Sequence, residues 1–145
     1  MSEISEAVAK ARAGANDTVI CRMASGWVVI GNIQLLPGYC LLLPDPVVPS
    51  LNDLTTDARI TYLRDMARIG DALLEVTGAY RINYEILGNT VPELHAHIIP
   101  RYAHEPDEQR RGPAWFYDWE NAKTYSAQEH GALFQQLRSV LQAGT

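Results

Sequence analysis

The segment Tyr80–Tyr102, YRINYEILGNTVPELHAHIIPRY, decides the fold and carries the candidate chemistry. Side chains alternate between the two faces of a β-strand, so a strand here places Glu93, His95 and His97 on one face. The opposite face then holds only apolar side chains, those of Leu94, Ala96 and Ile98. We therefore predict a strand over residues 94–101 with one packed face. Its other face is a row of a carboxylate and two imidazoles, which suits a phosphate, a metal ion or a reacting proton.

The sequence on both sides of this segment predicts an α+β domain with an antiparallel sheet and helices packed against one face. Apolar periodicity and turn residues predict the other elements. These are a helix over 3–13, a hairpin over 18–31, a strand over 39–43, a helix capped by Thr55 and ending before Gly78, a strand over 80–87, and a last helix capped by Ser126. Residues 103–125 read as a loop anchored by aromatic side chains. We expect one domain over residues 1–145, with a core of about 15–102 and a C-terminal aromatic loop and helix over 103–145.

Composition narrows the class of partner. The 145 residues are 47% hydrophobic and carry a formal net charge of −5, which gives enough material for a core and no broad basic surface for a nucleic acid polymer. The start of the sequence lacks the layout of a signal peptide, and its apolar runs are too short to span a bilayer. We therefore expect a cytoplasmic protein without a membrane partner. Cys21 and Cys40 are expected to be buried free thiols.

Two motifs resemble a known family. The run Gly88–Arg101, GNTVPELHAHIIPR, resembles the histidine triad (HIT) signature G-Q/N-x-V-x-H-x-H-x-H-x-x-P-R, with Glu93 at the position of the first histidine. The run Leu36–Leu54, LPGYCLLLPDPVVPSLNDL, resembles the second motif of that superfamily. The pattern is nearer the branch of fragile-histidine-triad and dinucleoside polyphosphate hydrolases. The resemblance implies a HIT-like antiparallel sheet of about five strands with helices packed on it, and a homodimer.

The resemblance also implies a reaction at the α-phosphate of a small-molecule nucleotide. The chain would be a nucleotide hydrolase or nucleotidyl transferase, with a dinucleoside polyphosphate as one example of its substrate. His95 would attack the phosphorus and form a nucleotidyl-histidine intermediate. His97 would donate a hydrogen bond to the phosphate and assist the leaving group, a role that suits a pKa near neutrality. Glu93 would accept a hydrogen bond that supports the nucleophile. The reaction implies neither a metal nor another cofactor.

Three asparagines are candidate substrate-binding residues by the same resemblance. Asn89 corresponds to a side chain that binds phosphate oxygens, although a turn residue with positive φ after Gly88 explains it equally well. Asn83 corresponds to a residue that contacts the leaving part of the substrate. Asn32 lies near a position that contacts ribose, and a hairpin turn is its structural alternative.

Two other functions fit the same residues. Glu93 would repel an incoming phosphate if its charge faced the site, which would leave a non-catalytic nucleotide-binding or sensor protein. Alternatively, Glu93, His95 and His97 would form the ligand set of a metal-dependent enzyme.

The predicted loop and the residues beside it hold further candidate side chains. Trp115 and Trp119 are expected to pack, to stack on a base or to seal a dimer contact. Three arginines are expected to be solvated or to reach a distal phosphate: Arg101, Arg110 and Arg111. His104 and His130 are expected to be solvated.

Overall fold

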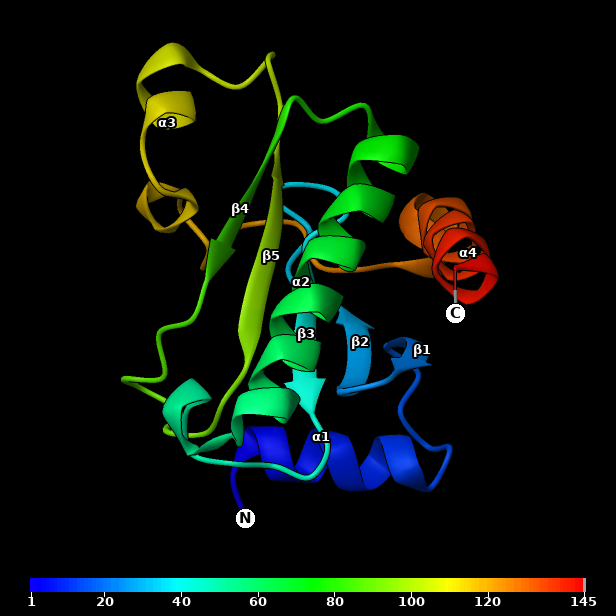
Figure 1. Ribbon diagram of the computed structural model, residues 1–145. Coiled ribbons are helices and arrows are strands. Elements are labelled where there is room, and N and C mark those ends of the chain that lie inside the picture. Colours follow the sequence, from blue (N-terminus) through cyan, green and yellow to red (C-terminus); the bar gives the residue numbers. More distant parts are fainter. Residues whose placement is uncertain (145) are drawn as a thin grey trace.

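A five-stranded antiparallel sheet forms the centre of the computed structural model, which describes residues 1–144 (Figure 1). The strand order is β1-β2-β3-β5-β4, so β4 lies at one edge and β5 lies between β3 and β4. The strands are β1 (Val19–Met23), β2 (Gly26–Ile30), β3 (Cys40–Pro44), β4 (Arg81–Glu85) and β5 (Ala96–Arg101). The predicted hairpin is confirmed as the β1–β2 pair, and β3 pairs antiparallel with β2 as expected.

Among the described residues, three helices lie close to their predicted bounds, whereas a fourth, short helix lies within residues 103–125, which the sequence predicted as a loop. They are α1 (Glu3–Arg12), α2 (Thr56–Thr77), the short α3 (Asp107–Arg111) and α4 (Ala127–Ala143), with 3-10 turns η1 (Leu51–Asp53) and η2 (Ala114–Phe116). The side chain of Thr55 accepts a hydrogen bond from the backbone N–H of Ala58, and Gly78 ends α2 with φ 71°. A glycine at that left-handed position avoids the Cβ clash that other residues meet.

One face of the sheet is covered by α2 and α4, which lie together on the same side in Figure 1. The main core fills the space between them and the sheet. It contains Leu42, Ala96 and Ile98 from the strands, Ile69 and Leu73 from α2, and Leu137 from α4. Ala96 and Ile98 point into this core, as alternation predicts for β5. The side chains of His95 and His97 therefore belong to the opposite face.

Helices do not pack against one face alone, which corrects the prediction. Ile4 and Val8 of α1 form a second cluster with Val29 and Leu43 on the histidine face of the sheet. The C-terminal loop covers another part of that face through a third cluster, in which Ala114 contacts Ile99. The histidine-bearing face thus lies between α1 and the aromatic loop.

Two local predictions are wrong. β5 begins at Ala96 and not at residue 94, because the backbone N–H of Leu94 donates to the carbonyl oxygen of Val48, in the loop after β3 (2.8 Å). His130 is buried and not solvated: its ring accepts a hydrogen bond from the N–H of Ser126 (3.1 Å) and stacks on Tyr125.

Two other predictions concern thiols and membranes. Cys21 and Cys40 are buried free thiols, as predicted. Within residues 1–144, each helix is too short or too polar to cross a bilayer.

Candidate active site

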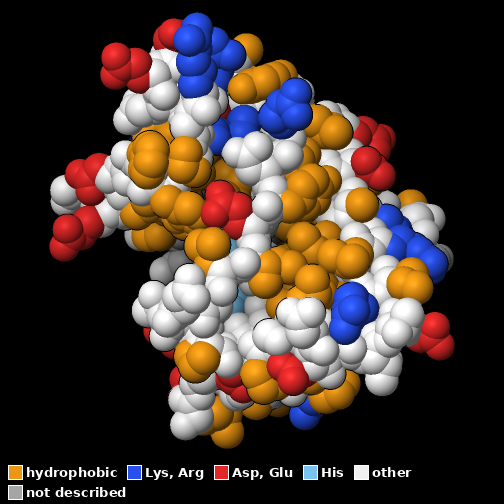
Figure 2. All heavy atoms as spheres, turned by 60° about the vertical axis from the view of Figure 1, so that its left-hand side comes forward, with side chains coloured by type: hydrophobic (Ala, Val, Ile, Leu, Met, Phe, Trp, Pro, Cys, Tyr) orange, Lys and Arg blue, Asp and Glu red, His pale blue; other side chains and the backbone are white. Residues whose placement is uncertain are grey.

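A cavity of about 330 Å³ opens on the sheet face that carries the histidines. His95 and His97 form its floor, and the segment Leu87–Val91 and Trp115 form its walls. In Figure 2, which turns the β4 side toward the viewer, histidine atoms are visible inside a central hollow. The predicted pair of imidazoles therefore faces an open space that a small ligand can enter.

The orientation of the His95 ring follows from one hydrogen bond. Its Nδ1 lies 2.7 Å from the backbone carbonyl oxygen of Glu93. A carbonyl oxygen only accepts, so Nδ1 carries the proton and Nε2 keeps its lone pair. The residue as a whole is 9% exposed, yet it contributes to the cavity lining. The ring is therefore held rigidly as the tautomer whose Nε2 can act as a nucleophile.

His97 lies beside His95 and is surrounded by aromatic groups. The two rings have centroids 4.9 Å apart at 70°, and Trp115 meets His97 edge-on at 4.9 Å. The hydroxyl of Tyr39 lies 2.7 Å from Nδ1 of His97. Burial and, to a smaller degree, the neighbouring His95 lower the pKa of His97 from 6.5 to about 4. His97 is therefore neutral near pH 7, which departs from the near-neutral pKa expected from the sequence.

The carboxylate of Glu93 does not stand in one row with the two imidazoles, because it is bound to the N-terminal helix. Its carboxylate accepts from the hydroxyl of Ser5 on α1, at 2.8 and 2.9 Å to its two oxygens. The residues that line the cavity, among those described, do not include Glu93. Glu93 thus contacts His95 through its backbone carbonyl, while its side chain is bound to the N-terminal helix.

The three asparagines lie in three different places. Asn89 is exposed and lines the histidine cavity. Its φ is not positive, since all positive-φ residues in the described chain are glycines, Gly88 among them. The turn explanation for Asn89 is therefore wrong in that detail. Asn83 lies on β4 and accepts a hydrogen bond from Arg101 (2.8 Å), in a neighbouring cavity. Asn32 is exposed, and its carbonyl accepts from the N–H of Tyr125 (2.7 Å).

The aromatic loop contributes directly to the site. Trp115 donates a hydrogen bond from its indole N–H to the carboxylate of Glu85, the cross-strand partner of His97. Trp119 packs on Trp115, with ring centroids 5.1 Å apart, and on Tyr39. Packing is therefore confirmed as the use of both tryptophans within this chain. Sequence reasoning missed Tyr39 and Glu85, although Glu85 shares its alternation with Asn83 on the predicted strand.

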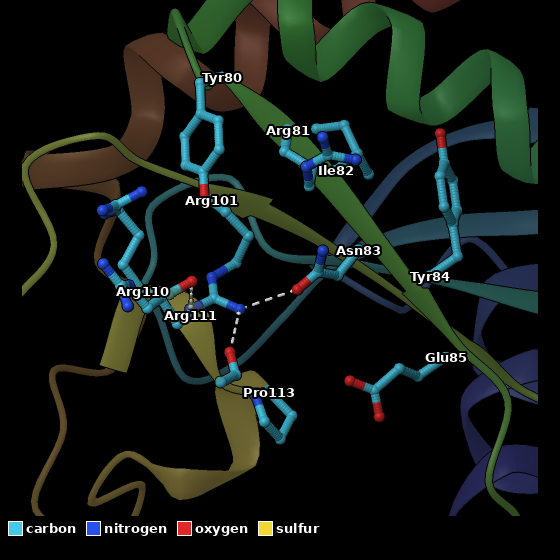
Figure 3. Close-up of a pocket in the computed structure, with 11 residues that line it drawn as sticks. Tyr80, Arg81, Ile82, Asn83, Tyr84, Glu85, Arg101, Arg110, Arg111 and Pro113 are labelled. Atoms are coloured by element: carbon cyan, nitrogen blue, oxygen red, sulfur yellow. Dashed lines mark hydrogen bonds between the residues drawn. The ribbon is translucent and has the colours of Figure 1, made fainter. Parts of the chain in front are cut away.

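A second cavity, of about 540 Å³, lies along the edge strand β4 (Figure 3). Arg101 lies in it with 2% exposure and forms a buried ion pair with Glu105 (2.9 Å). Its guanidinium also donates to Asn83 and to the carbonyl oxygen of Gly112. The prediction of a solvated Arg101 is wrong, because the side chain is buried and is paired with Glu105, four residues further along the chain.

The metal-dependent alternative finds no support in this geometry. Within the described residues, His, Cys, Asp and Glu side chains do not gather in groups of three that could hold a metal ion. His95 and His97 lie side by side, whereas the carboxylate of Glu93 is engaged by Ser5.

Comparisons with known proteins agree with the fold. The family model of the HIT domain matches residues 16–104. This chain belongs to the HIT domain family. It is 35% identical over 72 residues to the asymmetrical bis(5'-nucleosyl)-tetraphosphatase of Schizosaccharomyces pombe. Over 72 residues it is 33% identical to a bifunctional bis(5'-adenosyl)-triphosphatase/adenylylsulfatase of Arabidopsis thaliana. Each match covers 46% of this chain and 40% of the relative.

A solved structure extends the likeness to most of the chain. A histidine triad protein of Bradyrhizobium japonicum superimposes with a TM-score of 0.74 at 25% identity, covering 88% of this chain and 92% of that one. The predicted HIT-like fold is confirmed. The curated relatives have names of dinucleoside polyphosphate hydrolases, as the sequence motifs indicated.

Proposed function

We propose that this chain is a nucleotide hydrolase or nucleotidyl transferase that acts at the α-phosphate of a dinucleoside polyphosphate or related nucleotide. The orientation of His95 carries the proposal: its Nδ1 is held by the carbonyl of Glu93 and its Nε2 remains available beside an open cavity. The names of the relatives support the substrate class.

The reaction proceeds in two displacements. Nε2 of His95 attacks the α-phosphorus, the N–P bond forms, and the bond to the bridging oxygen breaks with release of the distal phosphate part. Water then attacks the same phosphorus, the N–P bond breaks, and a nucleoside monophosphate leaves. The proton lost by the water goes to solvent or to the released oxygen, and His95 returns to its neutral form. Two displacements replace one difficult step.

His97 serves as a neutral hydrogen-bond donor in this proposal. Burial raises the pKa of Tyr39, so its hydroxyl stays protonated and can donate to Nδ1 of His97. Nε2 of His97 then carries a proton that can be donated to a phosphate oxygen. Such donors stabilise the charge that develops in the transition state. Asn89, at the rim of the same cavity, is proposed to bind phosphate oxygens as well.

The roles of the other candidates follow their placement. Glu93 is proposed to position His95 through its backbone and through the Ser5 contact. Asn83, which lines the second cavity, is proposed to face the leaving part of the substrate. Asn32, exposed beside Tyr125, is proposed as a contact to ribose.

A non-catalytic nucleotide-binding or sensor protein is the second candidate. The observation that favours it is Glu93 itself, a carboxylate at the position where the family signature has a histidine. The bond of its carboxylate to Ser5 supports the enzymatic proposal instead, because a carboxylate held by α1 is turned away from the histidine cavity.

We also propose a cytoplasmic homodimer in which residues 1–145 act as one domain. β4 is an edge strand, and large apolar side chains are exposed on it and on α2: Ile60, Leu63, Leu74 and Tyr84. Hydrophobic side chains gather over this side of the molecule in Figure 2. Exposed edges and apolar patches are favourable surfaces for a second copy. Sedimentation of wild type and Leu63→Glu tests this, since a monomeric wild type would contradict it.

The enzymatic proposal is tested by His95→Ala with His104→Ala as the control. His104 is exposed in the loop and lies outside the cavity lining. We expect His95→Ala to lose turnover of a dinucleoside polyphosphate while it still binds nucleotide, and His104→Ala to behave as wild type. Wild-type binding without release of monophosphate would establish the sensor instead.

A further inference from the structure

The segment after β5 folds back along the face of that strand that carries the histidines. Side chains alternate between the two faces of a strand, so residues 97, 99 and 101 share this face. The segment meets them in reverse order of the strand, and the pairs are Gly112 with Arg101, Ala114 with Ile99, and Trp115 with His97. Four residues of strand span about 13 Å. The contact therefore has a polar end at Arg101 and an aromatic end at the candidate active site.

Arg101 fixes the polar end of this contact. Its side chain is 2% exposed, and its guanidinium donates to the backbone carbonyl oxygens of Gln109 and Gly112, each at 2.8 Å. A third hydrogen bond, also of 2.8 Å, goes to the side chain of Asn83 on β4 (Figure 3). A guanidinium can bind several acceptors at once because it presents five N–H donors in a rigid plane. Arg101 therefore joins the end of α3 to the sheet.

Glu105 holds both ends of the same segment. It is buried and pairs with Arg101 at 2.9 Å. Its carboxylate also accepts from the backbone N–H of Tyr102 and from the hydroxyl of Tyr117, each at 2.6 Å. Tyr102 directly follows β5, and Tyr117 directly follows η2, so one carboxylate ties down the segment that contains α3 and the first tryptophan of the loop. Both buried charges thus have the partners that a buried ion pair requires.

Trp115 is the part of this segment that reaches the histidines. It lines their cavity, meets the ring of His97 edge-on, and donates from its indole N–H to Glu85. Among the described residues, the titratable groups that face His97 are His95, Tyr39 and Glu85. These three groups lie on strands of the sheet or next to them, whereas Trp115 lies on the segment that Arg101 and Glu105 hold. A loosened segment would therefore expose His97 to water.

We propose that Arg101 and Glu105 form a clamp that positions Trp115 on His97 and so shields this imidazole from water. The role deepens the function proposed above and rests on it. The described residues that line the histidine cavity do not include Arg101 or Glu105, so both are positioning residues and not catalytic residues. A hydrogen-bond donor that is shielded from water stabilises developing charge more strongly than a solvated one. The clamp thus makes His97 a better donor to the phosphate.

The test replaces Arg101 with lysine, which keeps the charge opposite Glu105 but lacks the planar fork that binds the backbone of the segment. NMR of the imidazoles, without substrate, follows the titration of His97 from about pH 8 to about pH 4.5. In Arg101→Lys, the pKa of His97 should rise by about 1 toward its ordinary value of 6.5. The kcat on a dinucleoside polyphosphate should fall about tenfold. Arg111→Lys, at an exposed arginine of α3, is the matched control and should change neither quantity.

Two further variants keep the inference testable where Arg101→Lys disturbs folding. Tyr117→Phe removes one donor to Glu105 and should also raise the pKa of His97. In a Trp115→Ala background, Arg101→Lys should cause no further rise, because the clamp acts through the indole. An additive rise in that background, or an unchanged His97 in both Arg101→Lys and Tyr117→Phe, would overturn the inference. The expected titrations in a wild type that releases no nucleoside monophosphate would refute the proposed function alone.

Discussion

Removing the Ser5 hydroxyl tests how the N-terminal helix supports the nucleophile. Ser5→Ala deletes a donor to both oxygens of the Glu93 carboxylate, at 2.8 and 2.9 Å. A hydrogen bond to a charged group contributes about 1.5–3 kcal/mol to folding. Alanine recovers about 0.5 kcal/mol through its better helix propensity. The free energy of unfolding should therefore fall by about 1–2.5 kcal/mol. Because Glu93 also holds His95 through its carbonyl, kcat/KM should fall about tenfold from misplacement of the ring.

The assay combines urea denaturation with steady-state kinetics on a dinucleoside polyphosphate. Ser139→Ala is the control, since Ser139 is an exposed serine within α4 and reports the propensity gain alone. A double-mutant cycle of Ser5→Ala with Glu93→Ala isolates the coupling between the two side chains. A Ser5→Ala protein as stable and as active as Ser139→Ala would refute the reasoning.

Three further outcomes follow from the site. The pKa of His97 is about 4 in the folded protein and about 6.5 in the unfolded chain. The unfolded chain therefore binds the proton more tightly. As a result, the free energy of unfolding falls as pH drops from about 6.5 to about 4. With a discount for the partly exposed ring, the free energy of unfolding falls by about 1–2 kcal/mol over this range. His97→Asn should reduce this pH dependence, measured by urea denaturation at pH 7.5 and 4.5. An unchanged pH dependence would contradict the assignment. Trp115→Phe keeps the ring against His97 but removes the donor to Glu85, so KM should rise about fivefold, whereas Ala at the exposed Phe116 should leave KM unchanged; equal effects would rule out this contact. Glu93→Gln retains an acceptor for Ser5 and should keep kcat within about threefold, while a large gain in kcat/KM would indicate that the carboxylate repels the phosphate.

The sequence was sufficient where local rules determine the structure. Thr55 and Gly78 predicted the ends of α2, because capping and positive φ are local requirements. Alternation placed Ala96 and Ile98 in the core and His97 on the open face. The histidine pair was therefore predictable as part of one site.

The remaining features depend on contacts between distant segments. Ser5 and Glu93 are 88 residues apart, and Tyr39 and His97 are 58 apart. The local sequence around these residues contains no pattern that predicts either hydrogen bond. The burial of His130 was missed as well: its ring accepts a hydrogen bond from the backbone N–H of Ser126, at the start of α4.

The central claim is that Nε2 of His95 forms a bond to the α-phosphorus. Rapid acid-free quenching of wild type with a dinucleoside polyphosphate, followed by peptide mass spectrometry, measures this directly. We expect a nucleoside monophosphate adduct on the peptide that contains residue 95, localised to that histidine and absent from His95→Ala. Turnover at the wild-type rate by His95→Ala, or an adduct localised to His97, would contradict it.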